Sequence, residues 1–277
     1  MKALFTLILL GLTILFPGLT SASPCAKPDP ERRETGIDEC LIYRLFRSAS
    51  VASNPSLIIV LHGDVSSGGP ANYHRKVAER IAHDRRADNI ISVALVRPGY
   101  EDGDGESSSG SHNNRSDHYT AKNIDEIAAV VTKLRDRLQA RSVVLLGHSG
   151  GAAIFGVLVG RHPAVANAAV LVSCPCDVGV WRAGRRSPWP QSESPHSWAD
   201  KVAPTTMVVA LTGSRDDNTS PQLAERYIES LSRRGIKSRF ELLSNADHNS
   251  AFRSNRVIDA VFDLLAPQQR LLPSASP

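Results

Sequence analysis

The sequence predicts an α/β fold in which a doubly wound, mostly parallel sheet carries helices on both of its faces. Three observations support this expectation. Short apolar runs alternate with helical stretches, the runs are built from Val, Ile, Leu and Ala, and only 5% of the residues are aromatic. Alternation of this kind is typical of βαβ units around a parallel sheet. A chain of 277 residues with 42% hydrophobic content is also large enough to bury one sizeable core.

The expected elements follow in order along the chain. Continuous apolar runs such as 57–61 and 142–146 are typical of strands buried on both faces, whereas 238–243 alternates in polarity. We expect strands at 41–46, 57–62, 90–96, 142–147, 168–173, 206–212 and 238–243, and helices near 71–84, 119–139, 150–160, 221–234 and 250–265. The reactive loops of such a sheet lie at the carboxyl ends of its strands.

The N-terminus has the features of a signal peptide. Met1-Lys2 supplies a positive start, residues 3–19 are apolar, and small residues follow with a cleavage site after Ala22 or Ser23. The apolar stretch is near the lower limit for spanning a bilayer, which makes a retained anchor the less favoured alternative. We therefore expect an exported protein, periplasmic or secreted, without membrane attachment after cleavage.

Export to an oxidising compartment makes the four cysteines candidates for disulfides. Cys25 and Cys40 flank a polar stretch, and their pairing would tie it to the strand at 41–46. Cys174 and Cys176 follow the strand at 168–173, and a disulfide across one residue is strained. Cross-pairing, a free thiol pair and a soft-metal site are the alternatives, the metal site being the weakest for want of a second Cys/His pair.

The most specific motif is Gly147-His148-Ser149-Gly150-Gly151, between the apolar run at 142–146 and a helix that begins with small residues. A Gly-x-Ser-x-Gly segment between a strand and a helix forces the serine into a sharp turn that exposes its hydroxyl. The helix N-terminus favours developing negative charge beside it. Ser149 is therefore a candidate nucleophile, and the alternative is a glycine-rich turn with an idle serine.

A serine nucleophile needs a base within hydrogen-bond reach and a carboxylate that orients the base. Of the nine histidines only His248 lies beyond residue 196, and it follows the strand at 238–243. The acid is expected in the loop after the strand at 206–212, where Asp216 is the first choice and Asp217 the alternate. Asp247 would have to fold back on its own neighbour to orient the ring.

These motifs resemble those of the α/β-hydrolase superfamily, and the C-terminal part is similar to dienelactone-hydrolase-like and prolyl-oligopeptidase-like serine hydrolases. The resemblance covers about residues 41–265 and rests on Leu61-His62-Gly63, Arg97-Pro98-Gly99-Tyr100, the motif around Ser149, Ser194-Pro195, Gly213…Asp216 and Asp247-His248. It implies one α/β-hydrolase domain, which we expect at 23–266, between the signal peptide at 1–22 and a tail at 267–277 that is expected to be flexible. The chain departs from the family pattern in having no room for a propeller domain and in carrying Ser149 where dienelactone hydrolases use Cys.

Acyl transfer builds negative charge on the substrate oxygen, and fixed backbone N–H groups stabilise that charge. One expected donor is the amide of Gly150, directly after the nucleophile. The resemblance implies that the amide of Asp64, which follows His62-Gly63, is the second donor of this oxyanion hole. His62 itself is expected to be structural.

Two long loops are expected to shape a substrate pocket. The loop at 97–117 is too long and polar for a plain connection, and such loops are usually lids or disordered. The insert at 177–203 contains Trp181, Trp189 and Trp198. Their rings either line an acyl or aromatic subsite or anchor the insert onto the sheet.

The sequence thus predicts an exported serine hydrolase that cleaves a small ester, or less favourably an amide or short peptide, without a cofactor. The net charge of +4 is dispersed and no cluster of basic and aromatic residues occurs, which argues against nucleic acid as a partner. An aminopeptidase is the main rival and would need a carboxylate such as Glu193 or the acidic stretch 101–106. The second rival interpretation is a non-catalytic binding protein on the same scaffold. Acyl size, leaving group and oligomeric state stay open.

Overall fold

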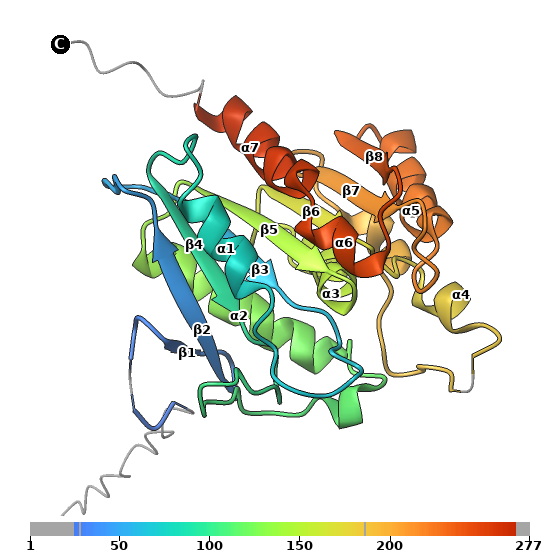
Figure 1. The fold of residues 1–277 in the computed structure, drawn as a ribbon, viewed down its shortest axis with the longest axis horizontal. Coiled ribbons are helices and arrows are strands. Elements are labelled where there is room, and N and C mark those ends of the chain that lie inside the picture. The colour runs from blue at the N-terminus through green and yellow to red at the C-terminus, as the bar shows by residue number, and fades with distance from the viewer. Residues whose placement is uncertain (1–24, 28, 186, 270–277) are drawn as a thin grey trace, which may run out of the picture.

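A single eight-stranded sheet forms the centre of the protein (Figure 1). The computed structural model describes residues 25–27, 29–185 and 187–269. The strands are β1 (Arg33–Thr35), β2 (Cys40–Arg47), β3 (Ser56–Leu61), β4 (Ile90–Leu95), β5 (Ser142–His148), β6 (Ala168–Val172), β7 (Met207–Gly213) and β8 (Ser238–Leu243). Their order in the sheet is β1-β2-β4-β3-β5-β6-β7-β8, in which the β1–β2 and β2–β4 pairs are antiparallel and the other pairs are parallel. The expected mostly parallel sheet is confirmed.

Helices cover both faces of the sheet. They are α1 (Arg75–Ala82), α2 (Ala121–Arg137), α3 (Gly150–Arg161), α4 (Val178–Arg182), α5 (Pro221–Arg233), α6 (His248–Arg253) and α7 (Asn255–Gln269), with short 3-10 turns η1 (Asn113–Arg115) and η2 (Pro195–Lys201). The apolar sides of α1, α6 and α7 pack on one face, in front of the sheet in Figure 1. Those of α2, α3 and α5 pack on the other. All residues of β3, β4, β5 and β6 are buried, as their continuous apolar runs predict.

Three elements differ from the expectations, the first being the short helix α4 in the insert, which was not predicted. The expected helix at 250–265 is two helices, because Ser254 adopts an extended conformation that ends α6 before α7 begins. The strand β1 was not predicted, since Arg33–Thr35 lacks apolar residues and pairs only at the sheet edge. The predicted signal peptide and residues 270–277 of the predicted tail lie outside the described residues. Within the described part of the chain, no helix combines the length and apolarity needed to cross a bilayer.

The cysteines lie in two pairs at disulfide distance. Cys25 pairs with Cys40, with sulfurs 2.02 Å apart, and Cys174 pairs with Cys176 at 2.07 Å. The structure therefore favours the two local pairings over cross-pairing. The first pair joins the N-terminal segment to the start of β2.

The two long loops take different roles. The loop at 97–117, expected to be a lid or disordered, folds onto β2 and α1 and contributes no residue to the lining of the cavity that contains Ser149. Within the loop, buried Asp102 pairs with Arg44 and Arg75. In the insert, Trp181 and Trp189 line a cavity, whereas the backbone and Cβ of Trp198 pack against Gly160 of α3. Trp198 thus anchors the insert, and Trp181 and Trp189 lie where a substrate subsite is expected.

The parallel register places the loops of interest at one edge of the sheet. Leu61, the last residue of β3, lies opposite Gly147 of β5, and His148 lies opposite Val172 of β6. On the other side of β6, Gly213 ends β7 opposite Leu243 of β8. The segments that follow β3, β5, β7 and β8 therefore meet at the carboxyl edge.

Candidate active site

Ser149 occupies a strained turn between β5 and α3. Its φ of 54° and ψ of −120° lie in a region that residues other than glycine rarely adopt. Its amide donates a hydrogen bond to the Val172 carbonyl at 2.8 Å. The turn is tight because the following helix packs closely on β3, where a Cβ on Gly151 would lie 2.5 Å from the His62 carbonyl oxygen. Within the described residues the Ser149 hydroxyl has no hydrogen-bond partner, and it lines a cavity of about 1200 Å³.

The structure brings Asp216 and His248 together. Both carboxylate oxygens of Asp216 lie 3.0 Å from Nδ1 of His248, which is the first residue of α6. The carboxylate also accepts hydrogen bonds from the Thr219 amide at 2.9 Å, the Thr219 hydroxyl at 2.9 Å and the Asn218 amide at 3.1 Å. Burial alone would raise the pKa of Asp216, but the hydrogen bonds and charge of His248 and the Thr219 amide outweigh it and lower the pKa to about 2. Asp216 is therefore ionised at neutral pH.

The two alternate carboxylates lie elsewhere. Asp217 is exposed and lines a smaller neighbouring pocket. Asp247 caps the N-terminus of α6, where its side chain accepts from the amides of Asn249 and Ser250. Of the three candidates, only Asp216 contacts the imidazole of His248.

The free edge of the His248 ring faces the same cavity as Ser149. Its Nε2 lies 3.4 Å from the side-chain nitrogen of Asn218, and no hydrogen bond joins it to Ser149 in the described residues. Catalytic hydrogen bonds between nucleophile and base often tighten only when substrate is bound. The three side chains thus arrive from the loops after β5, β7 and β8, in the order that the sequence indicates.

The two expected oxyanion donors lie on either side of Ser149. The amide of Gly150 begins α3, and the amide of Asp64 follows β3. Neither amide donates a hydrogen bond within the described part of the chain, which leaves both available to a ligand. The Asp64 carboxylate packs closely on the backbone of Gly150, where an added Cβ would lie 2.0 Å from Oδ1 of Asp64.

A buried polar cluster fixes the Asp64 loop. The Asp64 carboxylate accepts from Nη1 of Arg97 at 3.0 Å and from the Tyr119 hydroxyl at 2.6 Å, and its backbone carbonyl accepts from the Tyr100 hydroxyl at 2.9 Å. Arg97 is only 1% exposed. Burial, reinforced by the charge of Asp64, raises the pKa of Tyr119 and keeps its hydroxyl a donor. His62 is also buried, and its Nε2 accepts from the Arg97 amide at 3.0 Å, so its expected structural role agrees with this geometry.

A hydrogen-bond chain links the oxyanion loop to the histidine loop. The Gly63 amide donates to the Tyr73 hydroxyl at 2.6 Å. The same hydroxyl lies 2.7 Å from Nδ1 of His148, and Nε2 of His148 lies 3.0 Å from the His248 carbonyl. Burial, and after it the nearby His248, lower the pKa of His148 to about 3. A neutral His148 accepts from Tyr73 and donates to His248, which satisfies every bond of the chain. One path therefore connects the loops on both sides of Ser149.

Sequence reasoning missed the roles of these supporting residues. Tyr73 stands in a segment without a motif, and its contact with His148 depends on how α1 packs. Arg97 and Tyr100 were noticed only as part of a turn, and His148 only as the variable position of the serine motif. No group of three or more His, Cys, Asp or Glu side chains suited to a metal ion occurs in the described part of the chain.

The geometry agrees with comparisons to known proteins. The model of the alpha/beta hydrolase family matches residues 58–194, which include Asp64 and Ser149. The chain belongs to the α/β-hydrolase superfamily. No curated protein sequence matches this chain.

Solved structures with the same fold include esterases and a peptidase. Est1E from Butyrivibrio proteoclasticus with bound ferulic acid has a TM-score of 0.65 at 15% identity, over 84% of this chain and 99% of its own. The propionate-bound esterase Est2 of Thermogutta terrifontis, a Planctomycetes species, has a TM-score of 0.61 at 18% identity, over 90% and 98%. An acylaminoacyl peptidase has a TM-score of 0.63 at 14% identity, and the match covers 84% of this chain but 40% of the peptidase. At these identities the likeness shows the fold alone.

Proposed function

We propose that this protein is an exported serine hydrolase that cleaves carboxylic esters. The observation that carries the proposal is the pairing of Asp216 with His248 at 3.0 Å, beside the strained turn of Ser149 in one shared cavity. The fold neighbours that hold ferulic acid and propionate, both carboxylic acids of the kind released from esters, support this substrate class.

The proposed reaction follows from the positions of these groups. The Ser149 hydroxyl attacks the ester carbonyl while Nε2 of His248 takes its proton. Asp216 accepts the Nδ1–H of His248 and stabilises the imidazolium that forms. The amides of Gly150 and Asp64 bind the oxyanion of the tetrahedral intermediate. His248 then returns the proton to the leaving alcohol, and water cleaves the acyl-enzyme by the same steps in reverse.

The position of the acidic residues favours an esterase over an aminopeptidase. An aminopeptidase needs a free carboxylate in the cavity to hold the ammonium group of its substrate. Glu193 does not line the cavity and lies 3.4 Å from Arg161. No residue of the stretch 101–106 lines the cavity, and within it Asp102 is paired with Arg44 and Arg75 and Glu106 with Arg44. Asp64, the one carboxylate of the lining, is paired with a buried arginine.

Export is the second part of the proposal. It is supported by the signal-peptide features of residues 1–22 and by two cysteine pairs at disulfide distance, because disulfides persist in oxidising compartments. Expression of the full chain with a C-terminal tag, followed by fractionation and mass measurement of its N-terminus, tests this part. A product that begins near Ser23 outside the cytoplasm is expected, and an uncleaved cytoplasmic product would contradict export.

Covalent labelling tests the catalytic part. A fluorophosphonate probe is expected to add once to the wild-type protein and not to Ser149→Ala, as measured by intact mass. Ser67→Ala is the matched control, since Ser67 lines the same cavity without a role in the mechanism, and it should label fully. With 4-nitrophenyl butyrate, Ser149→Ala is expected to lose on the order of 10⁶-fold in kcat. An unlabelled, correctly folded wild-type protein would refute the proposal in favour of a binding protein.

A further inference from the structure

The cavity that contains Ser149 has a surplus of positive charge. Its basic lining residues are Arg75, Lys76, Arg80, Arg182, Arg185 and Arg253. Among the described residues, only Arg75 of these six has a carboxylate within 4.0 Å, in Asp102 and Asp104. The one acidic residue of the lining, Asp64, is already paired with Arg97. A cleft lined by one sign of charge concentrates ligands of the opposite sign.

Arg182 is held in a fixed position beside the oxyanion loop. Its guanidinium lies over the rings of Trp181 and Trp189, at 5.2 and 4.8 Å from their centres. Its Nε and Nη2 both donate to the Ser187 carbonyl, at 2.9 and 2.7 Å, so Nη1 has no partner in the described part of the chain. The Trp189 ring in turn packs edge-on against Tyr119, the residue that donates to Asp64. The guanidinium therefore has unused donors and lines the same cavity as Ser149.

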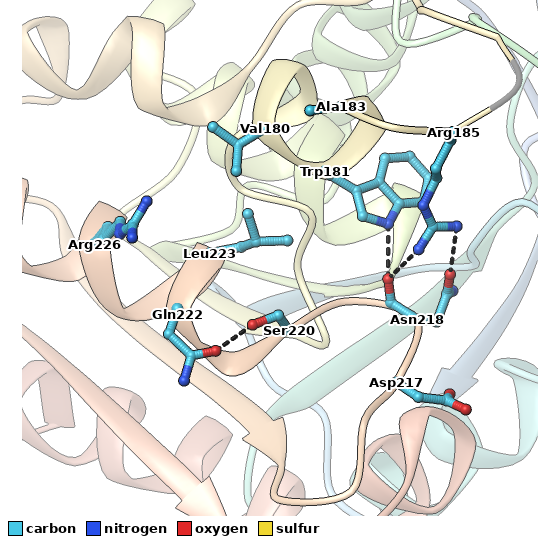
Figure 2. Close-up of a pocket in the computed structure, with 10 residues that line it drawn as sticks. All are labelled: Val180, Trp181, Ala183, Arg185, Asp217, Asn218, Ser220, Gln222, Leu223 and Arg226. Carbon is cyan, nitrogen blue, oxygen red and sulfur yellow. Dashed lines mark hydrogen bonds between the residues drawn. The ribbon is translucent and has the colours of Figure 1, made fainter.

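Arg185 is held in a similar way near the base. Its guanidinium lies 5.1 Å from the centre of the Trp181 ring and donates to the Asn218 carbonyl at 2.8 Å and to Oδ1 of Asn218 at 3.3 Å (Figure 2). The side-chain nitrogen of the same Asn218 lies 3.4 Å from Nε2 of His248. Arg182 and Arg185 thus line one wall of the cavity, from the oxyanion loop to the histidine.

The two guanidiniums repel each other. Burial and then the charge of Arg185 lower the pKa of Arg182. Asp217 does not relieve this repulsion, because it forms no ion pair with either arginine and points away from Arg185 in Figure 2. An anion bound between the two arginines would remove the repulsion and use donors that the protein leaves free.

We propose that Arg182 and Arg185 bind a carboxylate group carried by the ester that Ser149 cleaves. This inference rests on the proposed function, because it names the substrate class of the same site. The planar guanidinium matches a carboxylate with two parallel N–H···O bonds, and stacking on tryptophan holds it ready. We expect kcat/KM to favour an anionic ester about tenfold to a hundredfold over its neutral isostere.

Two matched ester pairs test this preference and show which half of the ester carries the charge. For the acyl half, mono-4-nitrophenyl adipate is compared with the analogue whose terminal carboxylate is a carboxamide. For the alcohol half, 3-acetoxybenzoate is compared with 3-acetoxybenzamide. The carboxylate-to-carboxamide ratio of kcat/KM is measured within each variant, so that any general loss of activity cancels. At least one ratio is expected to be tenfold or more in the wild type and to decrease with added salt.

The double variant Arg182→Gln/Arg185→Gln is expected to bring the ratio close to one. Arg226→Gln is the control, because Arg226 is an exposed arginine of the neighbouring pocket that does not line the catalytic cavity, and it should keep the wild-type ratio (Figure 2). A wild-type ratio near one for both pairs, with active hydrolysis of the neutral esters, would overturn the inference and leave the proposed function intact. The inference would also be overturned if the preference for the carboxylate ester persisted in the double variant or were lost in Arg226→Gln. No hydrolysis of any of the four esters and no fluorophosphonate adduct would refute the proposed function and this inference with it.

Discussion

Replacing Asp216 by Asn is the sharpest test of the proposed triad. The change is nearly isosteric, but the amide presents one nitrogen where the carboxylate accepts hydrogen bonds from His248, Asn218 and Thr219. It therefore removes the acceptor that holds the His248 tautomer with Nε2 free to take a proton. Loss of the tautomer in a Ser-His-Asp triad lowers kcat about 10⁴-fold. We expect a fall of that order with 4-nitrophenyl butyrate, while fluorophosphonate labelling becomes much slower.

The same substitution has a predictable effect on stability. The pKa of Asp216 falls from 3.8 to about 2 on folding, and since each pKa unit is worth about 1.4 kcal/mol, the ionised carboxylate stabilises the fold by about 2 kcal/mol. A carboxyl whose pKa is depressed in the folded state contributes this stability above its unfolded pKa and loses it as the pH falls toward the folded value. The difference in unfolding free energy between wild type and Asp216→Asn should therefore be about 2 kcal/mol at pH 7 and should shrink between about pH 4 and pH 2.

Asp217→Asn provides the matched control, because this neighbour is exposed and makes no contact with the imidazole. It should retain kcat within about twofold and change the unfolding free energy by less than about 0.5 kcal/mol. Urea unfolding at several pH values and steady-state kinetics measure both quantities on the same samples. The assignment of the acid is wrong if Asp217→Asn abolishes turnover while Asp216→Asn retains it.

Three further substitutions test the surrounding structure. Gly150→Ala places a Cβ 2.0 Å from Oδ1 of Asp64, so one oxyanion donor should shift and kcat should fall about a hundred- to a thousandfold; an unchanged kcat would contradict the assigned donors. Tyr73→Phe leaves the Gly63 amide and Nδ1 of His148 without partners. Urea unfolding should show that the unfolding free energy falls by about 1–3 kcal/mol. An unchanged unfolding free energy would mean that water replaces the hydroxyl. Replacing Cys25 and Cys40 by Ser removes a cross-link between residues 15 apart in the sequence. Thermal unfolding should then show about 3 kcal/mol less stability. An unchanged stability would mean that the pair is reduced in the native protein.

Much of the fold could be predicted from the sequence because the central strands carry their signal locally. The runs that form β3, β5 and β6 are apolar throughout, which indicates burial on both faces without knowledge of their neighbours. The sequence of β1 does not indicate a strand, because its three residues are polar and form a strand only by pairing with β2 at the sheet edge. The break at Ser254 was also hidden, since the residues around it continue a helical pattern and only the local backbone departs from it.

The candidate site was predictable in part for a similar reason. Ser149, Asp216 and His248 each follow a recognisable strand, and the parallel sheet brings such loops to one edge. The choice between Asp216 and Asp217 needed the structure, because adjacent side chains in a loop point in different directions. The length and polarity of the loop at 97–117 suggested a lid or disorder, because sequence does not show that buried Asp102 is neutralised by arginines from β2 and α1.

The supporting groups lay beyond sequence reasoning because each depends on two loops that meet only in the folded protein. Arg97 looks like a surface residue in a polar loop, yet it is buried because Asp64 and two tyrosine rings surround it. Burying the Arg97–Asp64 pair removes both charges from water, and the packing and hydrogen bonds around the pair must offset that free-energy cost. The pair therefore depends on the folded residues that surround it. Because Arg97 donates to the Asp64 carboxylate and to the His62 carbonyl, the contacts that bury the charges also hold the backbone of the proposed oxyanion donor. Stability and proposed catalysis are therefore coupled in this loop, and substitutions of Arg97 should alter both together.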